Sequence, residues 1–425
     1  ATVADIRERS RNGAASLWQV ALDRTAFYPT SGGQPYDTGS LRATAPSGAT
    51  LEAPILEVEE DEQGEVWHLT PKPLLAGTAV EATIDPARRR DHMQQHSGQH
   101  LLSALFNQEL NAPTVSFHLG DTVSTIDLAT PELSTADLAR TEQLANAIVA
   151  EGRPIAVRTI SSAEAQQLLA AGQLRKLPPR DGDIRLVVIP GDAASLPDRE
   201  HVELDLNACG GTHVASTSQI GPVLIRGTER IRQSIRVSFL CGDRALASAR
   251  IDDALLTQLG RELSVARPDL PAALARLKSD TKAAAKERQA LREELANYHA
   301  ARLLVEDQPE KDLRIVRRIF ADRDVDYTKL LASRVTSAAA HTIALLASTA
   351  EQGQPATLVI SCSKDLNSRN GSSSKEPPVD ASQLLRTALA SVGGRGGGSP
   401  SLAQGLVPQE QLAAVLDSLE SALRS

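Results

Sequence analysis

Cysteine, aromatic residues and long apolar runs are all scarce in this chain of 425 residues. Its three cysteines, Cys209, Cys241 and Cys362, are too few for a disulfide framework and suit a reducing compartment. Aromatics make up 3% of the sequence, so the cores must consist of Leu, Val, Ile and Ala. No apolar run approaches the roughly 20 residues of a membrane span, and the first residues lack the pattern of a signal peptide. These absences predict a cytoplasmic protein without a membrane partner.

The remaining composition is that of a globular protein. Hydrophobic residues account for 41% and charged residues for 23% of the chain. The length predicts roughly two to four domains. The net charge of -8 argues against a surface that coats nucleic acid uniformly, but it allows a local basic patch.

Residues 1–88 are rich in short, partly alternating apolar runs between Gly, Pro and Asp turns, a pattern typical of a small β-barrel or sandwich. A polar loop, Thr30-Ser31-Gly32-Gly33-Gln34, follows the aromatic pair Phe27 and Tyr28. Glycines allow positive φ and close backbone approach, which a ligand-binding loop needs. Taken alone, however, this string also fits a plain turn between two strands.

Residues 89–244 alternate strands and helices around an expected antiparallel sheet and predict an α+β domain. A helix is predicted over 91–107, with Asp91 as its N-cap. Histidines at positions 96 and 100 lie one turn apart on it, and a cysteine and a histidine at 209 and 213 repeat that spacing. Two such pairs closing on one ion are typical of a zinc site. The four candidate metal ligands are His96, His100, Cys209 and His213.

Several other residues of this domain are candidates for a functional site. Gly98 costs about 1 kcal/mol of helix propensity relative to Ala, which indicates that another group approaches the helix there. His118 precedes the turn of a predicted hairpin and either faces the metal or is a surface histidine. A basic rim for phosphates is expected from the arginines, unless they form only a solvated face. These are Arg88, Arg89, Arg90, Arg226, Arg230, Arg232 and Arg236.

Residues 245–309 predict a helical arm, because leucines and other apolar residues recur every seven positions between Leu270 and Val305. Residues 310–425 predict a small α/β domain. Within it, 366–378 has the composition of a mobile loop, and GGRGGGSPSLAQG is either a flexible linker or a loop that offers backbone amides to an anion. Neither phosphate-binding glycine motif of nucleotide sites is present, which favours an ATP-independent activity.

Three spaced motifs, FYPTSGGQPYDTG, QQHSGQHLLSA and CGGTHV, closely resemble the editing domain of alanyl-tRNA synthetases and its freestanding AlaX relatives. The tail GGRGGGSPSLAQG resembles the synthetase C-terminal domain, which also occurs in DHH phosphoesterases. One departure is Leu406, where a further glycine is expected. The chain has only Asp91-His92-Met93 in place of a DHH triplet, so a phosphoesterase is disfavoured. The resemblance covers nearly the whole chain and implies the long form of AlaX.

The resemblance implies a trans-editing aminoacyl-tRNA hydrolase, a carboxylic ester hydrolase without aminoacylation activity. Its expected substrate is seryl-tRNA(Ala), with glycyl-tRNA(Ala) as the second candidate; a noncatalytic zinc-containing tRNA-binding protein is the alternative. Zn2+ is the expected cofactor, with at least three of the four ligands bound. The arm and the C-terminal domain are expected to grip tRNA or to form a homodimer. By the family pattern Thr30 senses the serine hydroxyl. The catalytic candidates are Thr30, Gln34 and His118, and the substrate-binding candidates are Thr30, Gly32, Gly33, Arg88, Arg90 and Arg232.

Overall fold

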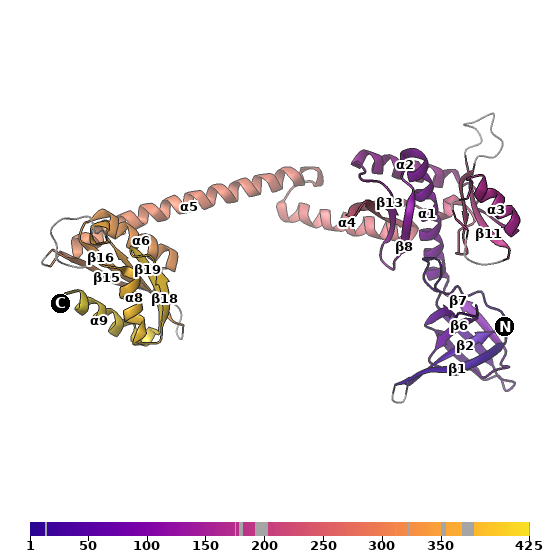
Figure 1. Cartoon of the computed structure of the whole chain (residues 1–425), viewed down its shortest axis with the longest axis horizontal. Helices are drawn as coiled ribbons and strands as arrows, with labels where there is room; N and C mark the ends of the chain where they lie inside the picture. The colour runs from indigo at the N-terminus through magenta and orange to yellow at the C-terminus, as the bar shows by residue number, and fades with distance from the viewer. Residues whose placement is uncertain are drawn as a thin grey trace. The chain divides into compact units, whose positions relative to one another are not determined.

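The computed structural model divides into two compact units, Ala1–Leu259 and Gly260–Ser425, and each is described by itself (Figure 1). Within the ranges described, no helix has both the length and the apolar character to cross a bilayer. The boundary between the units falls inside the predicted helical arm. The structure describes residues 1–12, 15–174, 176–177, 182–191, 203–310, 312–321, 323–349, 354–367 and 378–424.

The N-terminal domain contains two antiparallel sheets over one apolar core that includes Val20, Leu41 and Val58. One sheet has the order β1-β2-β6-β5, and the other has the order β4-β3-β7. The strands therefore form two separate sheets. Of the two predicted arrangements, the barrel is not confirmed and the sandwich is closer to what is observed. The strands are β1 (Val3–Asn12), β2 (Ala15–Leu22), β3 (Gly39–Thr44), β4 (Thr50–Ile55), β5 (Glu57–Glu60), β6 (Val66–Thr70) and β7 (Val80–Ile84).

Helix α1 (Pro86–Leu110) is the centre of the next domain, with nearly all residues from His92 to Phe106 buried. It begins earlier than predicted. Asp85 is the N-cap, because its carboxylate accepts hydrogen bonds from the first helical amides and Pro86 occupies the first turn. The predicted cap, Asp91, instead lies inside the helix and forms an ion pair with Arg244.

Two antiparallel sheets surround α1, with orders β13-β14-β9-β8 and β10-β11-β12. Helix α2 is capped by Ser134 and ended by Gly152. The common core is aliphatic apart from a few side chains such as Phe106 and Phe239, as the composition predicted. The helices and antiparallel sheets together confirm the α+β assignment. The elements are β8 (Thr114–Leu119), β9 (Ser124–Leu128), α2 (Thr135–Glu151), β10 (Ala156–Ile160), α3 (Ser162–Ala170), β11 (Ile184–Pro190), β12 (Glu203–Ala208), β13 (Val223–Ile231) and β14 (Ser234–Cys241).

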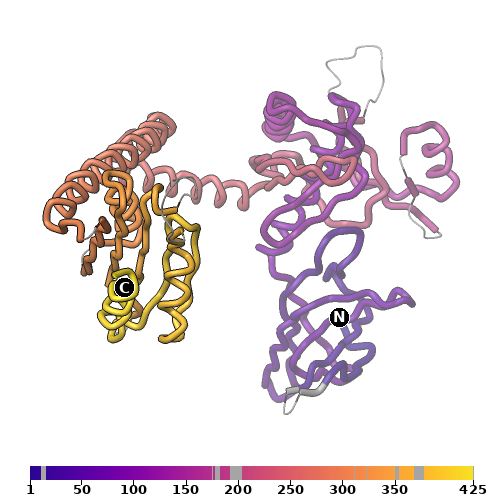
Figure 2. Tube along the Cα trace, turned by 60° about the vertical axis from the view of Figure 1, so that its left-hand side comes forward, coloured from indigo at the N-terminus to yellow at the C-terminus, as the bar shows by residue number. Residues whose placement is uncertain are grey.

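Two long helices follow, α4 (Gly242–Leu263) and α5 (Leu270–Glu306). The apolar seam predicted on α5 is largely exposed; Leu291, for example, is 58% accessible. A different face of the helix is buried at its C-terminal end, where Ala296, Ala300 and Leu303 pack against α6 (Val325–Ala338). The last turns of α5 lie beside the C-terminal domain that contains α6, and the earlier turns of α5 extend past that domain (Figures 1 and 2).

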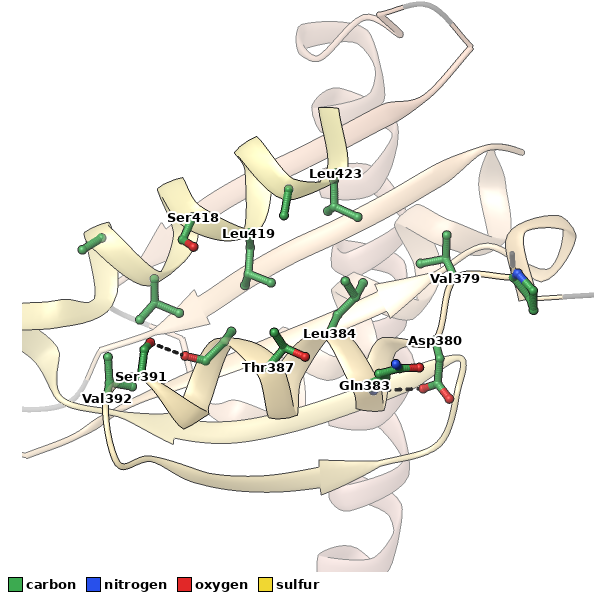
Figure 3. Close-up of a pocket in the computed structure, with 15 residues that line it drawn as sticks. Val379, Asp380, Gln383, Leu384, Thr387, Ser391, Val392, Ser418, Leu419 and Leu423 are labelled. Atoms are coloured by element: carbon green, nitrogen blue, oxygen red, sulfur yellow. Dashed lines mark hydrogen bonds between the residues drawn. The ribbon is translucent and has the colours of Figure 1, made fainter. Parts of the chain in front are cut away.

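The C-terminal domain has one mixed sheet of order β15-β16-β17-β19-β18, in which only β15 and β16 are parallel. Helices α5 and α6 cover one face of the sheet, while α8 and α9 cover the other. A groove of about 570 Å³ separates α8 from α9, with Leu384 and Leu419 on its walls (Figure 3). The remaining bounds are β15 (Arg314–Phe320), β16 (Thr342–Ser348), β17 (Ala356–Cys362), α7 (Lys364–Asn367), α8 (Ala381–Ala390), β18 (Arg395–Gly398), β19 (Leu402–Val407) and α9 (Leu412–Arg424).

The glycine run is neither a linker nor an open loop, which corrects the prediction. Arg395–Gly398 forms β18 and pairs with β19 as an antiparallel hairpin. A Cβ on Gly396 or Gly398 would collide with the β19 backbone, so the glycines allow close strand approach. The mobile loop predicted over 366–378 lies mostly outside the described residues.

Gly98 is required because Cys241 packs directly on α1 at this point. We expect Gly98→Ala to destabilise the domain by about 1–3 kcal/mol, because overpacking outweighs the helix propensity that Ala gains. Hydrogen exchange of the α1 amides should accelerate in this variant. The double variant Gly98→Ala/Cys241→Ala should restore protection, since it removes the obstructing thiol. If Gly98→Ala alone exchanged as slowly as the parent, the steric explanation would be wrong.

Candidate metal centre

Four side chains that are distant in sequence meet beside α1. His96 and His100 come from the helix, while Cys209 and His213 come from the loop after β12. One ligand atom from each residue lies within 4.8 Å of all the others. The Cys209 sulfur is 3.5 Å from His96 Nε2 and 3.3 Å from His213 Nε2. The four predicted ligands therefore form one cluster.

Each histidine of the cluster is held by a hydrogen bond at Nδ1. His96 Nδ1 is 2.8 Å from Gln34 Oε1, His100 Nδ1 is 2.7 Å from Asp205 Oδ2, and His213 Nδ1 is 3.1 Å from Ser97 Oγ. These contacts leave the three Nε2 atoms for the centre of the cluster. Outer partners of this kind fix the ring orientation and the tautomer of metal-binding histidines.

The electrostatics of the cluster favour a cation. Burial alone would raise the pKa of the Cys209 thiol, but hydrogen bonds from His100, His213 and His96 lower it strongly. Burial lowers the pKa of His96 and of His213, which keeps both imidazoles neutral. Burial would also lower the pKa of His100, but Asp205 and Cys209 raise it. A thiolate and a carboxylate thus converge on a buried site where a divalent cation would displace the proton on His100.

The donor set fits a metal ion. Three imidazole nitrogens and one thiolate are borderline-soft ligands, and four such groups can close a tetrahedral shell. Cys209 is the most exposed of the four residues, while the histidines are buried. These residues could therefore hold a metal ion, with Cys209 on the accessible side.

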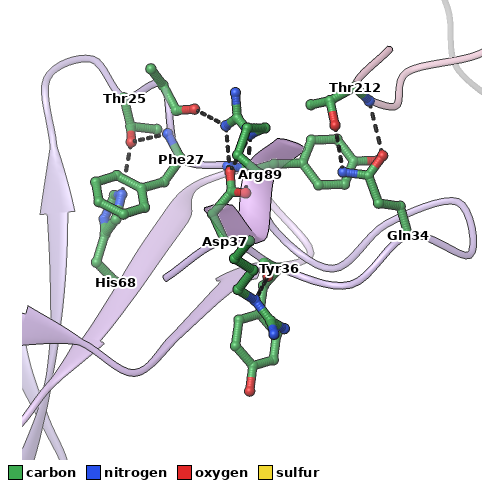
Figure 4. Close-up of polar contacts among 11 residues, drawn as sticks. Thr25, Phe27, Gln34, Tyr36, Asp37, His68, Arg89 and Thr212 are labelled. Carbon is green, nitrogen blue, oxygen red and sulfur yellow. Dashed lines mark hydrogen bonds and ion pairs between the residues drawn. The ribbon is translucent and has the colours of Figure 1, made fainter. Parts of the chain in front are cut away.

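The Thr30–Gln34 loop reaches this cluster through Gln34, which is completely buried. Besides accepting from His96, Gln34 Oε1 accepts from the Thr212 amide at 2.9 Å, and Gln34 Nε2 donates to Thr212 Oγ1 at 2.8 Å (Figure 4). Gly33, at φ +83°, lies against the Phe117 ring, and that ring is 5.8 Å from His96. Locally the segment is a turn, as its sequence also suggested, but this turn is joined by Gln34 to the cluster of three histidines and Cys209.

An ion pair fixes the other end of the same loop. Asp37 is fully buried and accepts from Arg89 of α1 through both carboxylate oxygens (Figure 4). Asp37 also accepts from the Tyr28 amide at 2.7 Å, which closes the base of the loop. Arg89 donates further to Ala26 O at 2.6 Å. The loop between Tyr28 and Asp37 is thus tied to α1 at its base and to the cluster at its tip.

The other candidates on this loop have clear positions. Thr30 is exposed, and its amide donates to Val58 O at 3.2 Å. Its side chain is therefore free to meet a ligand. Gly32 is also exposed and has φ +54°, a conformation that favours glycine.

His118 does not face the cluster. Its neighbours Phe117 and Leu119 point toward the domain core, and successive strand residues point to opposite faces. His118 is exposed accordingly. The suggestion that it faces the metal is not supported, and the geometry favours a surface histidine.

The arginine rim is largely neutralised. Arg89, Arg226 and Arg236 form ion pairs with Asp37, Asp252 and Asp127, respectively. Arg88 donates to Tyr36 O at 2.9 Å, and Arg230 donates to Pro131 O at 3.2 Å. Within the described residues, only two of the predicted seven, Arg90 and Arg232, are exposed and without such a partner.

Sequence reasoning missed the residues that support the cluster. Asp205, four residues before Cys209, orients His100, and Ser97 contacts His213. Arg185 holds the Cys209 loop by donating to Cys209 O at 2.7 Å and to Gly211 O at 2.8 Å. A carboxylate close to a ligand motif was a signal for Asp205, but no local pattern indicated Arg185 or Ser97.

Two parts of the chain match known protein families. Residues 184–236 match the second additional domain of threonyl and alanyl tRNA synthetases, and residues 315–425 match the DHHA1 domain. The first match includes Cys209 and His213. The chain thus combines a synthetase-type additional domain with a DHHA1 domain.

Whole-chain relatives agree with this combination. The alanine--tRNA ligase of Methanoculleus marisnigri is 30% identical over 92% of this chain and 39% of its own length. The ligase of Natronomonas pharaonis is 30% identical over 100% of the chain and 42% of its own. The alanyl-tRNA editing protein Aarsd1 of Mus musculus is 33% identical over 54% of the chain and 51% of its own. The chain therefore spans about half or less of these relatives. It is an AlaX-like relative of alanyl-tRNA synthetase.

We expect Cys209→Ala to weaken zinc binding by at least 100-fold, because it removes the thiolate and leaves three neutral imidazoles. Metal content after dialysis against a chelator, read by mass spectrometry, measures this. Cys241→Ala is the matched control, since Cys241 is buried against Gly98 and outside the cluster. Equal zinc content in both variants would remove Cys209 from the ligand set.

Proposed function

We propose that this chain hydrolyses the ester bond of mischarged alanine tRNA, chiefly seryl-tRNA(Ala), at a zinc site formed by His96, His100, Cys209 and His213. The observation that carries the proposal is the contact of Gln34 with His96. It joins the loop bearing Thr30 to the metal cluster, so that a hydroxyl-sensing group and a cation site belong to one structure. The relationship to a protein named for alanyl-tRNA editing supports this assignment.

The reaction is addition of water to the ester carbonyl, followed by loss of the ribose oxygen with a proton. Zinc, when bound, would act as a Lewis acid there, provided that one of its four protein ligands gives way to water or substrate. Cys209 is the most accessible ligand. The chain's own contribution is positional: Gln34, Asp205 and Ser97 orient the histidines, and the loop presents Thr30 to the substrate.

The catalytic candidates take different roles in this proposal. Gln34 is an amide whose oxygen already accepts two hydrogen bonds, so it positions groups and does not act as a base. His118 points away from the cluster. Thr30 is assigned to recognition, because a threonine oxygen can both donate to and accept from a serine hydroxyl.

The substrate preference follows from a selectivity problem. A site that activates alanine cannot strongly exclude serine, which only adds a hydroxyl, or glycine, which is smaller. A second site that requires the hydroxyl would remove serine and spare alanine.

The proposal has further parts. The cofactor is zinc, the reaction does not need ATP, the chain does not aminoacylate tRNA, and it acts in the cytoplasm. The exposed Arg90 and Arg232 would contact phosphates of the tRNA.

Deacylation of purified seryl-, glycyl- and alanyl-tRNA(Ala) by the zinc-loaded chain tests this function. We expect seryl-tRNA to be cleaved fastest and alanyl-tRNA to remain intact. Removing zinc, or replacing Cys209 by Ala, should abolish cleavage while tRNA binding persists. Binding of all three tRNAs with no hydrolysis would show instead a noncatalytic tRNA-binding protein.

Thr30→Val should reduce seryl-ester hydrolysis about 10-fold or more, since the serine hydroxyl loses its partner and is left unpaired. The size of the side chain and the zinc content should not change. The ratio of kcat/KM for seryl- and glycyl-tRNA is the measurement. Thr30→Ser is the matched control and should keep seryl activity. A loss of the same size on both esters would argue against hydroxyl sensing.

A further inference from the structure

Helix α5 carries a row of three lysines that form no ion pair with any residue that the structure describes. Lys278, Lys282 and Lys286 are four residues apart, so they lie on one face of the helix at steps of about 6 Å. All three side chains are exposed, and none forms an ion pair with a residue in the described part of the chain. Other cations of this helix differ: Arg276 pairs with Asp280, and Arg302 pairs with Glu306.

The lysine row continues the face that α5 buries against the C-terminal domain. Lys278 and Lys282 precede Ala296 and Ala300 by 18 residues, which is about five helical turns. Lys286 stands in the same relation to Leu304, which packs against the same core. The same side of the helix is therefore apolar where α6 covers it and lysine-rich where the helix extends past the domain.

We propose that Lys278, Lys282 and Lys286 form a docking surface for the phosphate backbone of the tRNA substrate. Regularly spaced, unpaired ammonium groups suit a regularly repeating row of phosphates. The row is a local positive surface on a chain of net charge -8. The inference rests on the proposed function for the identity of the RNA, and it assigns to α5 a role in binding and none in the chemistry.

The position of the lysine row on α5 favours RNA over a lipid surface as its binding partner. A membrane-binding helix carries its basic residues beside the apolar face that inserts. Here the exposed leucines, such as Leu277 and Leu291, project from roughly the opposite side of α5. Most of the exposed leucines therefore face away from a surface that the lysines contact, and Leu274, one turn before Lys278, is the exception.

The test compares two triple variants of the 425-residue chain. Lys278→Gln/Lys282→Gln/Lys286→Gln removes the row. Arg276→Gln/Arg288→Gln/Arg302→Gln removes the same charge from other faces of the same helix. Glutamine has nearly the helix propensity of lysine and arginine, so both variants should keep their helix content, as circular dichroism will show. Binding of an uncharged alanine tRNA transcript is measured from 50 to 300 mM KCl.

For the lysine variant we expect the slope of log affinity against log salt to become less steep by about 2–3, since three phosphate contacts are lost. The arginine variant should change the slope by less than about 1, and a triple Lys→Arg variant should retain it. An equal change in both glutamine variants would overturn the proposal, because it would show general electrostatics. So would lysine-dependent binding to anionic phospholipid vesicles with unchanged tRNA binding.

Deacylation separates this inference from the proposed function. In the lysine variant KM for seryl-tRNA should rise while kcat is unchanged, because the zinc site is intact. If the parent chain binds tRNA through the lysines but does not hydrolyse it, the proposed function fails and the docking surface stands. If hydrolysis proceeds with the same KM and salt slope in both triple variants, the docking surface fails alone.

Discussion

The hydrogen bonds of one buried amide hold the site together. Gln34 belongs to the N-terminal domain, yet its side chain contacts both His96 of α1 and Thr212 of the Cys209 loop. A buried amide that lost these partners would cost roughly 1–3 kcal/mol for each unsatisfied group. The packing of the N-terminal loop against α1 and the orientation of the His96 ring therefore depend on the same few atoms. The Arg89–Asp37 ion pair prevents the loop from pivoting about that point.

Much of the architecture could be predicted from local sequence, because periodicity and caps are local signals. The two pairs at 96/100 and 209/213 meet as their spacing indicated, and α1 contains the helix predicted over 91–107. Long-range contacts could not be predicted. No string indicated that Arg185 would hold the Cys209 loop. The start of α1 was misplaced for a different reason, because the local cap signal of Asp85 followed by Pro86 was passed over in favour of Asp91.

The apolar seam on α5 shows that a sequence repeat can predict a helix correctly without showing which face of the helix is buried. The heptad pattern selected Leu277 and Leu291, which are exposed, whereas the face that packs on α6 consists of Ala296, Ala300 and Leu303. Small residues allow close helix packing but give a weak hydrophobic signal in the sequence. The glycine run was misjudged for a related reason, since glycine marks close strand approach as readily as it marks a loop.

The three cysteines differ sharply in chemistry. Burial raises the pKa of Cys241 and raises that of Cys362 to about 12, so both thiols remain protonated and enclosed. Burial alone would raise the pKa of Cys209, but hydrogen bonds from His100, His213 and His96 lower it strongly, which favours the thiolate, and Cys209 is the most accessible of the three cysteines. An alkylating reagent would thus report on one position in the described chain, and only while no ion covers the sulfur. Oxidation by peroxide should follow the same rule and begin at Cys209, the accessible sulfur with the lowered pKa.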